Sequence, residues 1–467
     1  MQRAESIAPR TGRADDVAAL YDRVERGECC SVVGVSNVGK SSLLRTVARP
    51  ELLDARFGEA AARFALIYVD LNRMLHPSEQ GLYELVLRCL REWLSDRPEA
   101  ATPELSRLLD KAYADVVQPS SAFAVPLAFN RGITALAEAA ERRICLLLDE
   151  FDDPLARLEG RVFLNLRALR DQFSDRLSYV TATDRRLGLI RDGQDMGVEE
   201  FCELFAAREH HVRPMTSYDA LCFVRQVAED ADLGLPEEWL REVVAQVGGH
   251  PGLLEAAAYR AARLRAEPGR GADARLAALP DALAADETVR GECLKLWDDL
   301  PLGERQALDE LVRTGTARIA GALQSLTQKG LLAVRAPAEG GPGLAPFAPI
   351  WGRHIVWQRE ARRPSSMGVR MDVQTGEVWV DGTPVPYLTP LESRLLMMLY
   401  GHLGRVCTKE AIVEAVYGRE YIPEDDPALQ RLVRRLREKV EPDAANPSYI
   451  VSVRGYGYKL EGPEPPA

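Results

Sequence analysis

The first half of the chain alternates short apolar runs with longer stretches whose apolar residues recur at helical spacing. The runs cover residues 29–33, 64–69, 144–148 and 177–181. Short apolar runs of this kind predict buried β-strands. Because strands that alternate with helices build parallel sheets with helices on both faces, we expect an α/β domain over residues 15–213.

The pattern turns helical after this domain. Residues 214–283 predict a helical lid that is interrupted at His250-Pro251-Gly252. Residues 284–362 predict a small helical domain that ends in a hairpin, and the loop of that hairpin, residues 336–346, is rich in Gly and Pro. Residues 1–14 show neither pattern and are interpreted as an N-terminal tail.

The last hundred residues predict a compact α+β unit over residues 367–462. Strand-like segments lie at 369–373, 377–380 and 448–460, and the last of these reads as a hairpin with a Gly-containing tip. Thr389 and Glu392 can form a capping box at the start of a first helix. A second helix is expected from Thr408 to near Gly418.

The third helix of this unit is amphipathic. Asp426 can cap its start, with Pro427 in the first turn. Its core-facing stripe consists of Leu429, Leu432, Val433, Leu436 and Val440. Its opposite face carries Gln430, Arg431, Arg434, Arg435 and Arg437. Such a face fits the major groove of DNA, where Arg binds guanine edges or phosphates, although a solvated charged face is a common alternative for a helix.

Length and composition narrow the class of protein. A chain of 467 residues is long enough for three or four domains. Its net charge of -11 argues against non-specific wrapping of nucleic acid, so DNA contact requires a local basic surface. The eight cysteines form no Cys-x-x-Cys pair, which favours buried reduced thiols over disulfides or zinc. The absence of a long apolar run and of a secretory signal predicts a cytoplasmic protein without a membrane partner.

A phosphate-binding motif follows the first apolar run. Residues 34–41 match the pattern Gly-x-x-x-x-Gly-Lys-Ser, with a strand before it and a helix after it. Its glycines allow backbone N–H groups to surround phosphate oxygens, Lys40 reaches the β- and γ-phosphates, and the Ser41 hydroxyl can bind Mg²⁺. The residues assigned to the nucleotide here are Gly34, Asn37, Val38, Gly39, Lys40, Ser41 and Ser42.

An acidic pair ends the apolar run 144–148. Residues at the carboxyl end of a strand face the ligand crevice of an open α/β sheet. We therefore expect Asp149 to bind Mg²⁺ through water and Glu150 to orient or deprotonate the attacking water. A capping pair at a strand end is the alternative, and the phosphate motif upstream argues against it.

These residues resemble the AAA-like ATPases of the STAND and origin-recognition type, over roughly residues 15–265. The resemblance implies a sensor of the γ-phosphate at Thr183, where STAND proteins often carry Arg, and a contact of Pro251 with the bound base. It also implies that a winged-helix-like segment around residues 322–332 packs on the nucleotide and reports its state. The candidates for an arginine finger are Arg185, Arg186 and Arg213.

The C-terminal unit resembles the winged-helix effector domain of OmpR/PhoB-type response regulators. The strings Leu436-Arg437, Asn446-Pro447 and Val453-Arg454-Gly-Tyr-Gly-Tyr carry the resemblance, which covers residues 368–460. It implies a recognition helix over residues 427–440 and a wing over 449–460. It also implies that Arg454 reaches the minor groove. Response regulators place a receiver domain before this module, whereas here an ATPase-like module precedes it.

The sequence thus predicts a P-loop ATPase domain with a helical lid, followed by two winged-helix domains. We expect an ATP-binding, nucleotide-gated transcription regulator that binds ATP or ADP with Mg²⁺, binds double-stranded DNA, hydrolyses ATP slowly if at all, and forms homo-oligomers when ATP is bound. One alternative is a STAND-type signalling or defence scaffold whose C-terminal winged helix contacts protein. Another is an ATPase loader that acts on DNA with fast, DNA-stimulated hydrolysis.

Overall fold

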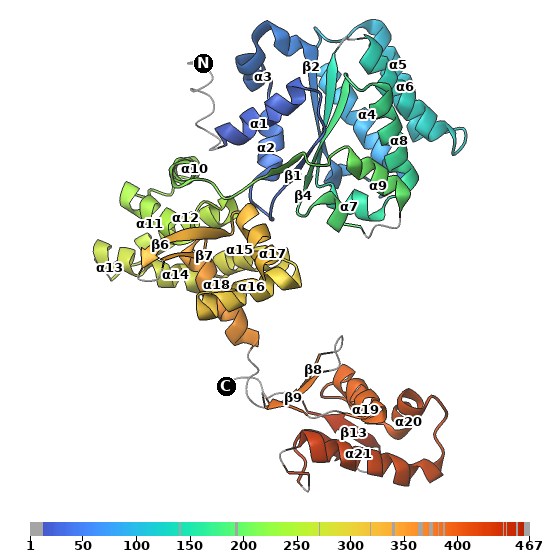
Figure 1. Cartoon of the computed structure of the whole chain (residues 1–467), viewed down its shortest axis with the longest axis vertical. Helices are drawn as coiled ribbons and strands as arrows, with labels where there is room; N and C mark the ends of the chain where they lie inside the picture. Colours follow the sequence, from blue (N-terminus) through green and yellow to red (C-terminus); the bar gives the residue numbers. More distant parts are fainter. Residues whose placement is uncertain are drawn as a thin grey trace. The chain divides into compact units, whose positions relative to one another are not determined.

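A five-stranded parallel sheet forms the centre of the N-terminal half of the chain (Figure 1). In the order in which they lie across the sheet, its strands are β2 (Phe64–Asp70), β3 (Arg143–Asp149), β4 (Leu177–Thr183), β1 (Cys30–Val33) and β5 (Glu209–His211). All four pairs of neighbouring strands are parallel, which confirms the α/β fold expected from the apolar runs. β5 does not stand out in the sequence, because its three residues are polar and only half buried.

The structure is a computed structural model. It describes residues 13–139, 142–191, 195–269, 271–317, 319–338, 341–362, 368–372, 377–381, 383–385, 388–441, 443–444, 446–453 and 456–461. The chain divides into two compact units, of which the first ends at Ile355 and the second begins at Val356. None of the helices in these described ranges is both long and apolar enough to cross a lipid bilayer.

Helices cover both faces of the sheet, because successive side chains of each strand point into two different cores. On β3, Cys145 and Leu147 belong to one core, and Ile144 and Leu146 belong to the other. The first core is covered by α1 (Ala14–Glu25), α2 (Lys40–Val47) and α3 (Pro50–Phe57). The second is covered by α4 (Glu79–Ser95), α5 (Pro103–Val117), α6 (Ala124–Ala139), α7 (Asp152–Arg157), α8 (Gly160–Gln172) and α9 (Met196–Glu203).

The helical part of the first unit shares the core of α1 and α2, so the sheet and these helices pack continuously. Its helices are α10 (Ser217–Asp230), α11 (Glu237–Val247), α12 (Pro251–Ala266), α13 (Ala272–Ala277), α14 (Leu279–Ala285), α15 (Glu287–Asp298), α16 (Leu302–Thr314), α17 (Ala320–Gln328) and the first part of α18 (Pro349–Arg362), which continues into the second unit. Between α17 and α18 lie the antiparallel strands β6 (Leu332–Ala338) and β7 (Gly341–Pro346). Most of the segment 336–346, which the sequence suggests is a loop, therefore lies in paired strands.

After α18, the described residues of the second unit form three α-helices and two small antiparallel sheets. The first sheet consists of β8 (Val369–Met371), β9 (Val378–Val380) and β10 (Thr383–Pro384), and the second of β11 (Val406–Thr408), β12 (Ile450–Val453) and β13 (Gly457–Leu460). Its helices are α19 (Pro390–Gly401), α20 (Lys409–Tyr417) and α21 (Asp426–Val440). The predicted capping box is present, with Thr389 and Glu392 bonded to each other's backbone N–H at the start of α19.

Candidate nucleotide site and nucleic-acid interface

The loop of the phosphate motif connects β1 to α2 and depends on two glycines. A Cβ atom on Gly34 would lie 2.8 Å from a methyl carbon of Val38 and 3.0 Å from the Val212 carbonyl oxygen. Gly39 has a φ of +102°, which side chains disfavour. The loop therefore closes tightly and delivers the chain into α2 at Lys40. The first N–H groups of a helix have no partner within it, so the start of α2 can bind an anion.

Lys40 is buried at the mouth of this loop, with 8% of its surface exposed. Its Nζ donates to the carbonyl oxygens of Gly34 and Val35, at 2.9 Å and 3.2 Å, and to Asp184 at 2.5 Å. A buried ammonium group is stable only with hydrogen-bond partners, and these three contacts supply them beside the loop. Asp184 follows Thr183 at the end of β4, and its pairing with Lys40 is not evident from the sequence.

The acidic pair lies at the carboxyl end of β3, as expected. Asp149 is 1% exposed and accepts a 2.6 Å hydrogen bond from the Tyr68 hydroxyl through one oxygen. Its other oxygen is buried and has no hydrogen-bond partner among the described residues. Glu150 is strained at a φ of +57° and lines the same cavity as the phosphate loop. Burial, and then the charge of Asp149, raise the pKa of the Glu150 carboxyl.

A third carboxyl, Asp152, completes this acidic edge. It accepts hydrogen bonds from the backbone N–H of Asp184 at 3.1 Å and 3.2 Å. Burial, followed by the charge of Asp184, raises the pKa of Asp152 to about 6. Burial is the main cause of both raised pKa values, and the neighbouring carboxylates add to it. Buried carboxyl groups with raised pKa values are typical of a site that binds a cation or accepts a proton.

A cavity of about 840 Å³ lies over the phosphate loop. Its lining residues are Ser36, Asn37, Gly39, Lys40, Ser41, Ser42, Arg45, Glu150, Asp184, Pro251, Gly252, Glu255, Ala256, Tyr259, Thr288 and Glu292. The structure thus brings the predicted phosphate-loop residues together with Glu150 and Pro251. Asp149 and Val38 are buried behind this lining. Gly34, at the start of the loop, is buried too.

A second cavity of about 520 Å³ adjoins the first at Gly39, Ser42 and Pro251. It is mostly lined by apolar or neutral groups, among them Val17, Leu43 and Phe223. The cavity is also lined by Arg49 and Asp230, so its wall is mixed, and its apolar part beside the phosphate-binding loop suits a flat aromatic base. Arg13 also lines this pocket and donates to the Val38 carbonyl oxygen of the phosphate loop and, at 3.0 Å, to that of Arg213.

Some predicted residues lie away from the cavities. The Thr183 side chain is fully buried and donates to the Arg185 carbonyl oxygen at 2.7 Å. Of the three arginine-finger candidates, Arg185 is exposed, whereas Arg186 and Arg213 both bond to Gln328 at the end of α17. In this structure, therefore, Thr183 and the three arginines do not line the cavity over the phosphate loop.

Three residues of the helical part approach the phosphate loop and are not evident from the sequence pattern. The Asp299 carboxylate accepts from Ser36 N–H at 2.6 Å and from the Ser36 hydroxyl at 3.1 Å. Glu292 accepts from the Asn37 side chain at 2.8 Å. His250 bonds the Ser36 carbonyl oxygen at 2.9 Å through Nε2. The expected base contact of Pro251 and the expected packing of residues 322–332 on the nucleotide point to the helical part in general. Neither identifies Asp299 or Glu292, because a single acidic residue on or after a helix carries no signal by itself.

Helix α21 carries the basic face predicted for DNA. Arg431, Arg434 and Arg435 are exposed, and Arg434 forms an exposed ion pair with Glu438 at 3.1 Å. Arg437 is half-buried and instead donates to the Ile450 carbonyl oxygen of β12 at 3.0 Å and to the Ser452 hydroxyl at 2.9 Å. The remaining predicted DNA contact, Arg454, lies outside the described residues.

The start of α21 differs from the sequence prediction. Asp425, and not Asp426, occupies the capping position, and its side chain makes no capping bond to α21. The Asp426 carboxylate accepts from Lys409 at 2.6 Å and from the Tyr421 hydroxyl at 2.8 Å. Since these partners lie on α20 and the segment after it, Asp426 fixes α21 to its neighbours instead of capping it.

Comparison with known proteins identifies both parts of the chain. Residues 9–180 match a family described as the AAA ATPase domain, and residues 382–460 match the family "Transcriptional regulatory protein, C terminal". Sensory transduction protein RegX3 of Mycolicibacterium smegmatis is 46% identical over 94 residues, which are 20% of this chain and 40% of RegX3. The transcriptional regulatory protein SphR of Synechococcus elongatus, for alkaline phosphatase synthesis, is 38% identical over 73 residues, 16% of this chain and 28% of SphR.

This chain thus spans less than half the length of these relatives. A solved structure of a Walker-type ATPase from Pyrococcus abyssi covers 74% of this chain and 95% of its own, with 15% identity and a TM-score of 0.46. The family matches and the geometry of the two units lead to the same assignment. The chain carries an AAA-type ATPase domain in its N-terminal part and an OmpR/PhoB-type winged-helix transcriptional regulatory domain at its C-terminal end.

Proposed function

We propose that the protein is a transcription regulator whose DNA binding is gated by ATP and ADP. The observation that carries the nucleotide part is the cavity where the phosphate loop, Lys40 and the carboxyl end of β3 meet. The apolar part of the adjoining cavity beside Pro251 would receive the base, so both ends of a nucleotide have a place to bind.

The residues at this site fit a nucleotide with Mg²⁺. Ser41 lines the cavity and carries a hydroxyl that can bind Mg²⁺. The unpartnered buried oxygen of Asp149 is an acceptor that a hydrated cation satisfies. Bound Mg²⁺ neutralises charge on the phosphates. Glu150 would hold the attacking water, and its raised pKa suits it to accept a proton. Thr183 must release its bond to the Arg185 carbonyl oxygen before it can sense a phosphate.

The exposed arginines of α21 carry the DNA part of the proposal. Arg431, Arg434 and Arg435 lie on one face of a helix whose opposite face is buried in the core of the second unit. Arginine presented in this way reads guanine edges or clamps phosphates in the major groove. Arg454, which follows Val453 in the sequence, would reach the minor groove, as the resemblance to OmpR/PhoB-type domains implies. Arg437 would support the wing through its bonds to β12.

The gate is proposed to lie in the helical part of the first unit. The segment from α15 to α18 is interpreted as a first winged helix, as in the STAND-type ATPases that the sequence resembles. Its acidic residues contact the phosphate loop directly, so occupancy of the loop by phosphates must alter that contact. Assembly into homo-oligomers with ATP is part of the same proposal.

Selection of DNA sites on the purified full chain, with ATP, with ADP and without nucleotide, tests the function. We expect specific duplexes whose affinity falls with salt and differs between ATP and ADP. Binding of one set of sites with the same affinity in all three conditions would remove the gate and leave a plain DNA-binding protein. Failure to retain any duplex at low salt would remove the DNA function.

A further inference from the structure

The phosphate loop is held by carboxylates of the helical part, and these occupy groups that such loops offer to phosphates. Backbone N–H groups of the loop are phosphate ligands in P-loop proteins. In this structure the backbone N–H and the hydroxyl of Ser36 both donate to Asp299, and the side-chain amide of Asn37 donates to Glu292. Glu292 lies on α15 and Asp299 directly follows it, so one helix places both carboxylates on the loop.

From these contacts we infer that Asp299 and Glu292 form an acidic latch, which closes the helical part on the empty or diphosphate-occupied loop and is displaced by a third phosphate. The inference rests on the proposed nucleotide binding and names the groups that would tell ATP from ADP. It requires that the latch and the third phosphate compete for one place, whereas the latch and a diphosphate do not.

The position of Lys40 gives the reason for this competition. Its Nζ contacts the carbonyl oxygens of Gly34 and Val35, so it lies at the Ser36 end of the loop. A P-loop lysine reaches the β- and γ-phosphates, whereas the helix start at Lys40 binds the phosphates nearer the base. The terminal phosphate of a triphosphate therefore arrives beside Ser36, where the Asp299 carboxylate already lies.

Charge makes the two occupants incompatible. The cavity is already lined by four acidic residues, Glu150, Asp184, Glu255 and Glu292, against the cations Lys40 and Arg45. A terminal phosphate brings further negative charge into a half-buried space, where like charges repel more strongly than in water. One N–H group also cannot serve two anions at full strength. A triphosphate therefore favours the state in which Asp299 has left Ser36. A diphosphate binds without using the place beside Ser36, so it does not favour that state.

Ser36, to which the latch binds, is also held by His250 at the start of α12. Release of the latch can therefore affect more than one side chain. His250 Nδ1 accepts from the Leu253 N–H at 3.3 Å, so its Nε2 donates to the Ser36 carbonyl oxygen. Burial lowers the pKa of His250 to about 4, which keeps this ring neutral. Ser36 is thus held through both of its backbone groups. Its carbonyl oxygen binds His250 at the start of α12, and its N–H binds Asp299 directly after α15.

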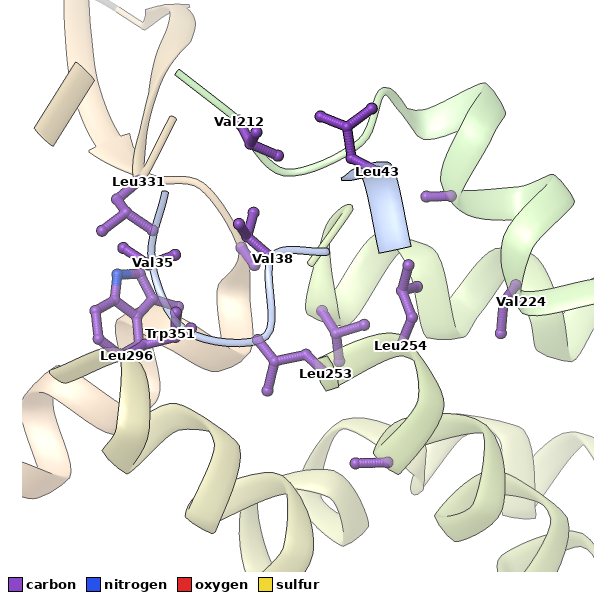
Figure 2. Packing of buried hydrophobic residues seen from close by; sticks show 14 of the residues in the cluster. Val35, Val38, Leu43, Val212, Val224, Leu253, Leu254, Leu296, Leu331 and Trp351 are labelled. Atoms are coloured by element: carbon purple, nitrogen blue, oxygen red, sulfur yellow. The ribbon is translucent and has the colours of Figure 1, made fainter. Parts of the chain in front are cut away.

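Apolar packing continues the contact around the loop. Figure 2 shows Val35 and Val38 of the loop in the same buried cluster as Leu331 and Trp351 of the helical part. Gly252 allows the close approach of α12, since a Cβ there would lie 2.4 Å from a Glu292 oxygen and 3.0 Å from the Cβ of Asn37. Displacement of Asp299 therefore loosens a surface that includes α12, α15 and α18.

Asp299→Asn in the full chain tests the latch, because the amide keeps an acceptor for Ser36 N–H but removes the charge. Its matched control is Asp298→Asn, which removes the same charge one residue away. The Asp298 carboxylate is exposed and is only loosely paired with Arg305, at 3.7 Å. Calorimetry with Mg²⁺ measures the dissociation constants of ADP and of the non-hydrolysable analogue AMPPNP. We expect Asp299→Asn to raise the preference for AMPPNP over ADP at least tenfold and Asp298→Asn to change it less than twofold.

Hydrogen exchange of residues 34–42 in the nucleotide-free chain provides a second measurement, and Asp299→Ala should exchange there at least tenfold faster than the wild type. Equal changes for ADP and AMPPNP, or the same change in Asp298→Asn, would overturn the latch while leaving nucleotide binding intact. Unchanged exchange in Asp299→Ala would overturn it too. If neither the wild type nor Asp299→Asn binds either nucleotide, the proposed function fails first and the discrimination fails with it.

Discussion

The nucleotide site and the DNA-facing helix are built in opposite ways. The nucleotide site joins residues far apart in the chain, and Ser36 and Asp299 are separated by 263 positions. The DNA face uses one helix of 15 residues. Charges at the first site are buried and bonded, as for Lys40 at 8% exposed, whereas the side chain of Arg434 is 81% exposed. Since a buried charge needs its partners and an exposed one does not, substitutions should disturb the first site structurally and the second mainly electrostatically.

The largest effect is expected for Lys40→Ala. Removal of the only ammonium among the residues that line the larger cavity should weaken binding of ATP with Mg²⁺ at least a hundredfold, about 3 kcal/mol. Calorimetry measures the affinity, and circular dichroism checks that the fold is kept. Wild-type affinity in this variant would place the phosphates elsewhere. If Lys40→Ala still binds DNA without nucleotide, the two regions act separately, because the charge of α21 does not depend on the nucleotide site.

The next effect is the pH dependence of stability, which arises from the buried nucleotide site. Burial lowers the folded-state pKa of His250 from 6.5 to about 4, so between these values the unfolded chain binds the extra proton. The stability that His250 contributes is therefore complete above pH 6.5 and is lost as the pH falls towards 4. Between pH 6.5 and 5 the loss is about 2 kcal/mol. Asp152, with its pKa raised to about 6, acts in the opposite direction over part of this range.

Urea unfolding followed by tryptophan fluorescence at pH 7, 6 and 5 measures this loss. His250→Asn should be less stable at pH 7 and should lose less stability on acidification than the wild type. Parallel stability curves for the two proteins would show that His250 does not titrate in this window.

Smaller effects are expected for two arginines of α21, one of which should affect stability and the other DNA binding. Arg437→Ala removes hydrogen bonds to Ile450 and Ser452 and should destabilise the second unit by about 1–2 kcal/mol. Arg435→Ala should leave stability within about 0.5 kcal/mol but weaken DNA binding about tenfold and lower the salt slope by about one. Thermal unfolding and gel shifts at two salt concentrations distinguish these outcomes. If Arg435→Ala is the destabilised variant, the two roles are reversed.

The smallest effect is expected for Glu438→Gln. This substitution removes a negative charge from the DNA face and frees Arg434 from an exposed ion pair, which is worth at most about 1 kcal/mol. We expect a two- to threefold gain in DNA affinity at low salt that disappears at high salt. A loss of affinity would mean that Glu438 itself contacts DNA.

Local pattern predicted much of the fold. The four apolar runs became β1 to β4, Thr389 and Glu392 form their capping box, and the helix from Thr408 ends at Gly418 in a left-handed conformation. The exceptions have local causes. The residues of β5 are polar, and the Gly- and Pro-rich segment around residues 336–346 pairs as strands only because the partner strand satisfies its backbone.

What the sequence by itself determined is the chemistry that adjacent residues carry: a glycine loop with Lys40 and Ser41, an acidic end to β3, and a helix with one apolar and one arginine face. These follow from backbone geometry and from periodicity, which act over a few residues. Only the tertiary structure decided that Asp184 pairs with Lys40, that Asp299 holds Ser36 and that Arg437 faces β12 instead of solvent. Hydrogen bonds between segments depend on how the cores pack, and no spacing along the chain encodes that distance.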